Sequence, residues 1–335
     1  MNKRVKFLYL VLFLLPLVVF FFSFNIGSYP IPFKELMKTL LSPLFPSLKH
    51  GLLPVYSDIV FGIRFPRLLL ALAIGASLSV SGASLQALFK NPLVNEYILG
   101  ISSGAAFGAS ISLVFLRRGI PTQAAAFFCA LVAVFIVLFV ARNSESPLIS
   151  LLLTGVIVSA FFSALLALVE FFASPYSLQA LFYWLMGNLA LATWKDLAVS
   201  LPIMAFGVTL LILLRWRMNV LSLSDEEAQS IGINVRVEKM LIILVAALTT
   251  SAATAVAGII GWIGLIVPHL VRMMVGVDNR RVIPLSAAVG ASLLILADDI
   301  TRAIASYEIP VGIFTSLIGI PFFIVLLKKS KRTWL

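Results

Sequence analysis

Residues 241–257 read LIILVAALTTSAATAVA and residues 7–24 read FLYLVLFLLPLVVFFFSF, without a charged side chain in either run. A helix needs about 20 mostly apolar residues to cross the hydrocarbon core of a bilayer. Backbone groups in lipid must be satisfied within the protein, so only helices and closed barrels cross it. Barrel strands alternate apolar and polar residues, whereas these runs are continuous. The pattern therefore predicts an all-α fold of membrane helices.

The composition of the whole chain supports this fold class. The 335 residues are 61% hydrophobic and 12% charged, with a mean hydropathy of +1.09, whereas soluble domains are roughly half apolar and about a quarter charged. The net charge of +11 could suit nucleic acid, but Lys and Arg flank the apolar runs, where they orient membrane helices. We therefore expect contact with membrane lipid and no nucleic-acid partner.

We predict ten membrane spans and read the chain as a single domain over residues 1–335. A basic segment precedes the first run and no Ala-x-Ala site closes it, so we expect an uncleaved first helix with a cytoplasmic N-terminus. Ten spans place the C-terminus there too, together with 16 of the 25 Lys and Arg residues, as the positive-inside rule requires. The predicted spans are 7–24, 66–89, 96–116, 122–140, 147–172, 194–214, 238–257, 258–274, 282–303 and 310–327, with an interfacial helix at 175–186.

Small residues recur at helical spacing in several of these spans. Gly100, Gly104 and Gly108 are four residues apart, and Gly75, Ser79 and the pair Gly82-Ala83 repeat this spacing in an earlier span. Small faces let membrane helices approach closely. The spacing predicts a densely packed bundle.

Several chemistries have no motif in this chain. It has no Gly-x-x-x-x-Gly-Lys-Ser/Thr phosphate loop and no His-Glu-x-x-His zinc motif, and His50 and His269 are far apart in sequence. We therefore expect no enzyme activity, no cofactor and no metal in this chain. An energy source must come from elsewhere, unless the protein is an ion-coupled secondary carrier, which would need intramembrane acids or broken helices.

Four segments resemble a known family in the same order along the chain. They read RFPR at 64–67 with GASL at 75–78 and SG at 81–82; QALFKNPL at 86–93 with LGISSGA at 99–105; GWIGLIVPHLVR at 261–272; and AD at 297–298 with Arg302, IPVG at 309–312 and GIP at 319–321. From about residue 7 onward the chain resembles the permease subunits of type II ABC importers for iron-siderophores, haem and cobalamin.

The resemblance implies partners and a mechanism. Such permeases have ten helices with cytoplasmic termini in the cell (inner or plasma) membrane, and pair with a second copy or a paralogous permease. Two ATPase subunits bind the ATP, and a periplasmic or lipid-anchored protein delivers substrate. We therefore expect a transport permease rather than an enzyme, with the choice among siderophore, haem and cobalamin left open.

The resemblance also assigns roles at the two membrane faces. Arg64, Arg67 and Arg302 are expected at the outer face, where they would bind carboxylates of the binding protein bidentately; the alternative is snorkelling to lipid headgroups. Asn91 and Leu93 match part of a cytoplasmic gate, whose other loop falls at residues 146–150.

A polar segment at about residues 220–236 resembles the coupling helix that sits on the ATPase. Ser224 and Glu227 have the spacing of a capping box, and Gly232 can end the helix; the alternative is a solvated loop helix. The predicted coupling residues are Ser224, Asp225, Glu226, Glu227, Ala228, Gln229, Ser230, Ile231 and Gly232. The predicted pathway residues are Thr154, Ser159, Ser163, Thr315 and Ser316.

Overall fold

The structure is a computed structural model that describes residues 3–49, 51–116, 119–142, 147–304 and 309–329. Its regular elements are all helical in these ranges. In chain order they are α1 (Lys3–Ser23), α2 (Phe33–Leu41), the 3-10 helix η1 (Pro46–Lys49), α3 (Pro54–Ser57), the π-helix η2 (Asp58–Arg64), α4 (Phe65–Phe89), α5 (Ile101–Ile111), the π-helix η3 (Ser112–Leu116), α6 (Thr122–Ala141), α7 (Pro147–Phe171), α8 (Pro175–Leu185), α9 (Trp194–Leu213), α10 (Arg215–Leu221), α11 (Asp225–Ser230), α12 (Val235–Ala257), α13 (Ile263–Val275), α14 (Asn279–Ile304) and α15 (Val311–Lys329).

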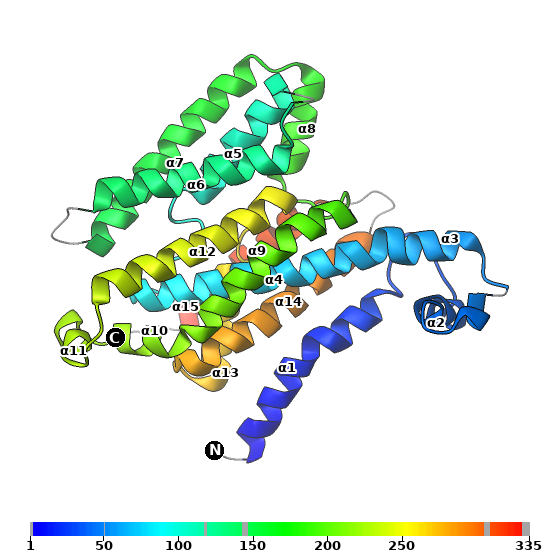
Figure 1. Cartoon of the computed structure of the whole chain (residues 1–335), viewed down its shortest axis with the longest axis horizontal. Helices are drawn as coiled ribbons and strands as arrows, with labels where there is room; N and C mark the ends of the chain where they lie inside the picture. Colours follow the sequence, from blue (N-terminus) through cyan, green and yellow to red (C-terminus); the bar gives the residue numbers. More distant parts are fainter. Residues whose placement is uncertain (1–2, 50, 117–118, 143–146, 305–308, 330–335) are drawn as a thin grey trace.

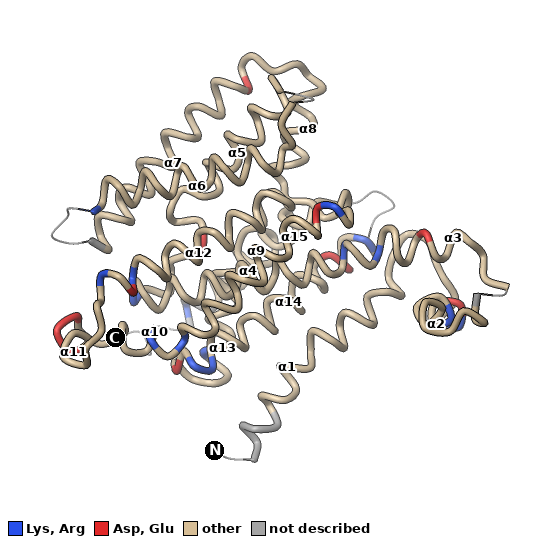
Figure 2. The backbone as a smooth tube through the Cα atoms, viewed as in Figure 1, with Lys and Arg blue, Asp and Glu red and all other residues tan. Residues whose placement is uncertain are grey.

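Helix length and composition confirm a multi-pass membrane fold. In the described part of the chain, six helices are long and apolar enough to cross a membrane, and four more apolar helices are shorter. Most charged residues lie near the two ends of the long helices, with few between (Figure 2). The spans of full length are Pro54–Phe89, Thr122–Ala141, Leu148–Phe171, Trp194–Leu213, Val235–Ala257 and Asn279–Ile304. The total of ten crossings and the side of each terminus stay predictions.

Helix α4 runs through the middle of the bundle (Figure 1). It packs against α9, α12, α13 and α14, while α5, α6 and α7 form a second group joined to it through α12, and α1 packs on α14. In the span that includes α4, 83% of the most apolar window is buried, compared with 28% in α7 and in α9. Helix α4 is therefore enclosed by protein, whereas α7 and α9 present apolar side chains outward.

Glycines permit the closest approaches within the bundle, as the small-residue spacing predicts. A Cβ added to Gly82 would collide with the backbone of Gly264 in α13, and one added to Gly75 would collide with Gly290 in α14. Gly108 meets the backbone of α6 in the same way. These contacts confirm the expected dense packing of α4 and α5.

Two helices begin later than the apolar runs predict. The predicted span 96–116 starts at Ile101, because Gly100 adopts φ +76° and the preceding residues form turns. The predicted span 258–274 starts at Ile263, because Gly258 and Trp262 have φ values of +74° and +73°. A left-handed residue interrupts the helical hydrogen-bond ladder, so hydropathy alone places both starts too early.

Candidate docking, gate and coupling sites

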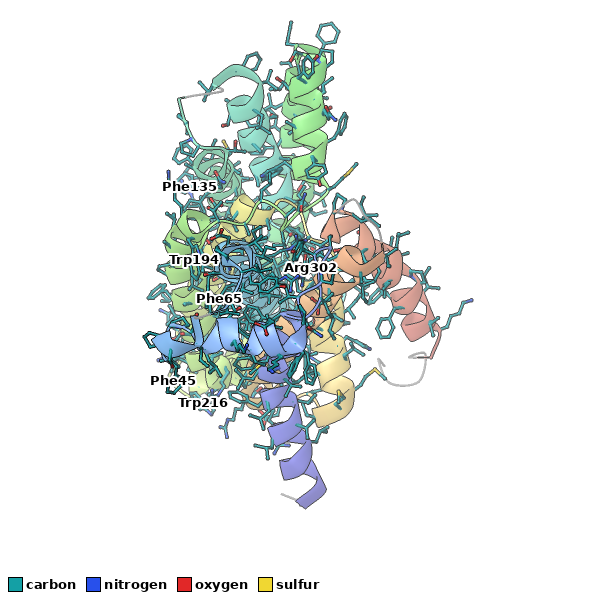
Figure 3. All side chains as sticks on the ribbon, turned by 90° about the vertical axis from the view of Figure 1, so that its right-hand side faces the viewer. Phe45, Phe65, Phe135, Trp194, Trp216 and Arg302 are labelled. Atoms are coloured by element: carbon teal, nitrogen blue, oxygen red, sulfur yellow. The ribbon has the colours of Figure 1, made fainter. Side chains whose placement is uncertain are left out.

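The three arginines with an expected docking role lie at one end of α4 and α14, and their side chains are buried. Arg64 is 4% exposed, Arg67 is 3% exposed and Arg302 is 5% exposed. Viewed from this end of the bundle, Arg302 lies among the helices and Phe45 lies at the periphery (Figure 3). All three guanidinium groups therefore lie inside the protein rather than in solvent or among lipid headgroups, and their position at the outer face stays a prediction.

Two aspartates of α14 neutralise most of this positive charge. Arg67 Nη2 lies 2.8 Å from Asp298 Oδ1, and Arg67 Nε lies 3.0 Å from Asp298 Oδ2. Arg302 Nε lies 3.1 Å from Asp298 Oδ2, and Arg302 also pairs with Asp299. We call Arg64, Arg67, Arg302, Asp298 and Asp299 the buried charge cluster. Buried charges are tolerated when they are paired and hydrogen-bonded. Arg67 and Arg302 are paired with the two aspartates, whereas Arg64 is hydrogen-bonded to backbone carbonyls.

The buried charge cluster also holds the end of α1. Ser23 Oγ donates to Asp299 Oδ2 at 2.5 Å, and Arg302 Nη1 donates to the Ile26 carbonyl at 2.7 Å. The two Nη atoms of Arg64 donate to the Phe24 and Tyr29 carbonyls. The cluster therefore joins α1 to α4 and α14.

Sequence reasoning missed the role of Asp298 and Asp299 in this cluster. They stand four and three residues before Arg302, a spacing that puts opposite charges on one helix face. That spacing was the available signal. The docking role of the three arginines stays a prediction, and it requires the guanidinium groups to change partners.

The predicted gate residues lie in the turn after α4. Asn91 Oδ1 accepts a hydrogen bond of 2.9 Å from the Leu93 amide, and the Leu93 side chain is 55% exposed. The bond closes an Asx-turn, which Asn favours. The other gate loop, 146–150, lies partly outside the described residues. The structure thus leaves the Leu93 side chain at the surface.

The coupling segment forms a short capped helix, α11. Ser224 Oγ accepts from the Glu227 amide at 3.2 Å, and Glu227 Oε2 accepts from the Ser224 amide at 2.9 Å. Gly232 follows the helix with φ +85°. The predicted capping box and glycine stop are both confirmed.

One face of α11 is anchored and the rest is exposed. Ala228 is buried, and Asp225 pairs with Lys239 of α12 at 2.8 Å. Lys90, directly after α4, donates to the Leu223 carbonyl at 2.5 Å. The predicted coupling residues Asp225, Glu226, Glu227, Gln229, Ser230, Ile231 and Gly232 are exposed, as is Ser224.

Electrostatics at α11 favour a charged carboxylate. Hydrogen bonds from the Ser224 amide and hydroxyl hold the pKa of Glu227 below its ordinary value, and the Lys90 ammonium adds to the lowering. A cavity of about 250 Å³ beside this helix is lined by Asp225, Gln229 and Arg236 among others, between α6, α7 and α12. The segment thus offers an acidic, largely solvated surface.

The pathway candidates fall on two helix groups. On α7, Thr154 is buried, Ser159 is half-buried and Ser163 is exposed. On α15, Thr315 and Ser316 both donate to the Gly312 carbonyl, at 3.1 Å and 2.8 Å. Because α7 packs on α5 and α6, and α15 packs on α13 and α14, the chain by itself does not assemble these residues into one site.

No cluster of metal-ligating side chains is found in the ranges that the structure describes, where no three His, Cys, Asp or Glu residues come together. Asp298 and Asp299 are adjacent, but both carboxylates face arginines. The free Cys129 is half-buried. The two sites with the most developed polar contacts are therefore the buried charge cluster and the α11 segment.

Comparison with known proteins identifies the kind of molecule to which these sites belong. A "Probable iron chelatin transport system permease protein" of Helicobacter pylori is 42% identical over 82% of this chain and 84% of its own length. A molybdate import permease of Haemophilus influenzae is 38% identical over 83% of both chains. A hemin transport permease of Yersinia pestis is 36% identical over 99% of both.

A solved structure of a metal-chelate type ABC transporter in an inward-facing conformation superposes with a TM-score of 0.86. It is 32% identical in sequence, and the match covers 97% of this chain and 99% of that one. The FecCD transport family matches residues 14–329. The helix bundle and these matches agree, and the chain is a membrane permease that belongs to the FecCD transport family.

Proposed function

We propose that this chain forms the membrane pathway of an ABC importer for an iron chelate, haem or cobalamin. Two copies, or one copy and a paralogous permease, would pair, with two ATPase subunits on the α11 side and a substrate-binding protein on the other. Ten crossings with both termini on the α11 side fit the arrangement of basic residues. The observation that carries the proposal is α11, because a short capped helix with exposed carboxylates suits docking into another subunit.

Transport would proceed by alternating access. ATP-driven closure of the ATPase pair would displace the two α11 helices, and the displacement would reach α10 and α12, which flank α11 in the chain. Asn91 and Leu93 would open or close the inner end of the pathway between α7 and α15 of the two copies. The chain itself would bind substrate weakly, with affinity residing in the binding protein.

In docking, arginines of the buried charge cluster would exchange their present partners for carboxylates of the binding protein. Arg64 donates to backbone carbonyls, so exchanging its partners leaves no aspartate unpaired. We expect Arg64→Gln to reduce the stimulation of ATP hydrolysis by the binding protein, while hydrolysis without that protein stays unchanged. Lys34→Gln, an exposed substitution at the same end, is the control. If the binding protein stimulates ATP hydrolysis equally in Arg64→Gln and in the wild type, Arg64 has no docking role.

The proposal is tested by reconstituting the chain with its genetically neighbouring ATPase and binding protein in proteoliposomes. Uptake would be measured with a radiolabelled ferric siderophore, haemin, cobalamin and molybdate, the last because a relative is named for it. ATP-dependent uptake of one probe supports the importer. Failure of the chain to form a complex with any ATPase would contradict it.

An ion-coupled carrier is the second candidate, and one side chain favours it. Glu96 is fully buried, and its carboxylate lies against Gly264 at the first turn of α13. Buried acids inside a membrane bundle often bind protons or cations during transport. Uptake by the chain alone that is abolished by ionophores and by Glu96→Gln would establish the carrier, whereas uptake that needs the ATPase and ignores ionophores would exclude it.

A further inference from the structure

A single lysine connects the end of the central helix to the start of the coupling segment. Lys90 is the residue directly after α4, and its Nζ lies 2.5 Å from the carbonyl of Leu223, one residue before the capping serine of α11. The two residues are 133 positions apart in sequence. The positive charge of Lys90 also helps to hold the pKa of Glu227 below its ordinary value, after the larger effect of the Ser224 hydrogen bonds.

The backbone at Lys90 is unfavourable for a lysine. It adopts φ 51° and ψ 32°, and Trp262 is the other non-glycine residue with positive φ in the described ranges. Glycine adopts this left-handed conformation without the steric conflict that a Cβ introduces. The local turn therefore does not favour a lysine at this position, whereas its ammonium group does make a contact with the α11 segment.

The same turn contains the candidate gate residues and is hydrogen-bonded to the end of α4. The Asn91 amide donates to the Gln86 carbonyl of α4 at 3.2 Å, and the Asn91 side chain accepts from Leu93. Gln86 is in turn bonded to Arg272 of α13. Lys90 thus lies between the Leu223 carbonyl and the turn that contains Asn91 and Leu93.

We infer that Lys90 is the positioning residue that transmits movement of α11 to the Asn91–Leu93 turn. The inference rests on the proposed function, because α11 moves only if an ATPase docks there. The Asp225–Lys239 pair would hold α11 to α12 independently, so loss of Lys90 would leave the ATPase docked and active while its work fails to reach the gate.

The experiment measures ATP hydrolysed per substrate transported in proteoliposomes of the whole complex, with whichever of the four probes the wild type takes up. We expect Lys90→Met and Lys90→Gly to raise this ratio at least about fivefold, the lower end of typical coupling between sites. Lys90→Arg should restore it. Lys90→Gly also relieves the backbone strain. A raised ratio in this variant would therefore show that the effect comes from loss of the ammonium group and not from the backbone conformation. Lys195→Met, an exposed lysine at the start of α9, is the matched control.

An unchanged ratio in Lys90→Met and Lys90→Gly would overturn the inference, as would an equal rise in Lys195→Met. Absence of ATP-dependent uptake by the wild type would instead refute the proposed function. In that case, amide hydrogen exchange of residues 225–228 in detergent tests whether the contact between Lys90 and the Leu223 carbonyl stabilises α11. Faster exchange in Lys90→Met than in Lys195→Met would support a stabilising contact, and identical exchange in the two variants would contradict it.

Discussion

The two ends of the bundle hold their charges in opposite ways. At one end, the buried charge cluster encloses three arginines and two aspartates among α1, α4 and α14. At the other end, Asp225 and Lys239 meet near the surface, where the Asp225 side chain is 56% exposed. Removing one partner of a buried pair costs about 3–5 kcal/mol, whereas exposed pairs contribute about 0–1 kcal/mol.

This difference separates stability from movement. Removing one partner from the buried charge cluster leaves an uncompensated buried charge, so changing its partners is costly. The contacts of α11 contribute little to stability, so they can form and break at small cost during a transport cycle. A substitution at the first end should therefore be detected by unfolding, and one at the second end by coupling or by local exchange.

The largest expected effect tests the comparison directly. Asp298→Ala leaves Arg67 and Arg302 without their shared carboxylate, so we expect the free energy of unfolding to fall by about 3–5 kcal/mol. Asp225→Ala should lower it by about 1 kcal/mol or less. Denaturant titration in mixed micelles measures both. Equal losses at the two sites would break the comparison.

The next effect concerns the packed middle that connects the two ends. Gly82→Ala places a Cβ against the Gly264 backbone, and overpacking of this kind costs about 1–3 kcal/mol. Gly62→Ala is the control, since nothing lies within 4 Å of its added Cβ. The same denaturant titration compares them. If Gly82→Ala proves as stable as Gly62→Ala, then α4 and α13 can separate and the middle is not rigid.

A smaller, local effect is expected at the start of α11. Ser224→Ala removes the hydroxyl that accepts from the Glu227 amide, and loss of such a cap costs about 1 kcal/mol. Amide exchange of residues 225–230 should accelerate, while global unfolding stays unchanged. Ser230→Ala, at the other end of the same helix, should leave the first turn protected. A lower free energy of global unfolding in Ser224→Ala would contradict this and would show that α11 is part of the main cooperative unit.

The smallest effect is a pH dependence confined to α11. The pKa of Glu227 is lowered from its ordinary 4.5 by the Ser224 hydrogen bonds, so the ionised carboxylate contributes stability that is present above 4.5 and lost as pH falls through the lowered value. Exchange protection of α11, corrected for intrinsic rates, should stay constant from pH 7 to about 5 and decline below 4.5. Glu227→Gln should abolish this decline. A decline already complete at pH 5 would contradict the sign of the shift.

Local patterns were sufficient to predict much of this molecule. Continuous apolar runs predicted the six long spans, and the spacing of Ser224, Glu227 and Gly232 predicted both ends of α11, because helix caps depend on neighbouring residues. Local spacing also predicts that Gly82 and Gly75 approach other helices closely, but it does not identify which helices these are.

Features that depend on distant contacts could not be predicted in the same way. The burial of Arg67 results from a partner 231 residues away, and hydropathy treats a paired arginine like an exposed one. The late start of α13 follows from Trp262 in a left-handed conformation, which propensity assigns to glycine. The contact between Lys90 and Leu223 likewise exists only after the two segments meet in space.

The enclosure of α4 has a consequence for biosynthesis. Ser77, Ser79, Ser81 and Ser84 are fully buried in the finished bundle, against helices that are made later in translation. When α4 leaves the ribosome, α9, α12, α13 and α14 do not yet exist, so these hydroxyls first meet lipid or the insertion machinery. The surroundings of the central helix are therefore complete only after α14, in the C-terminal third of the chain, has been synthesised.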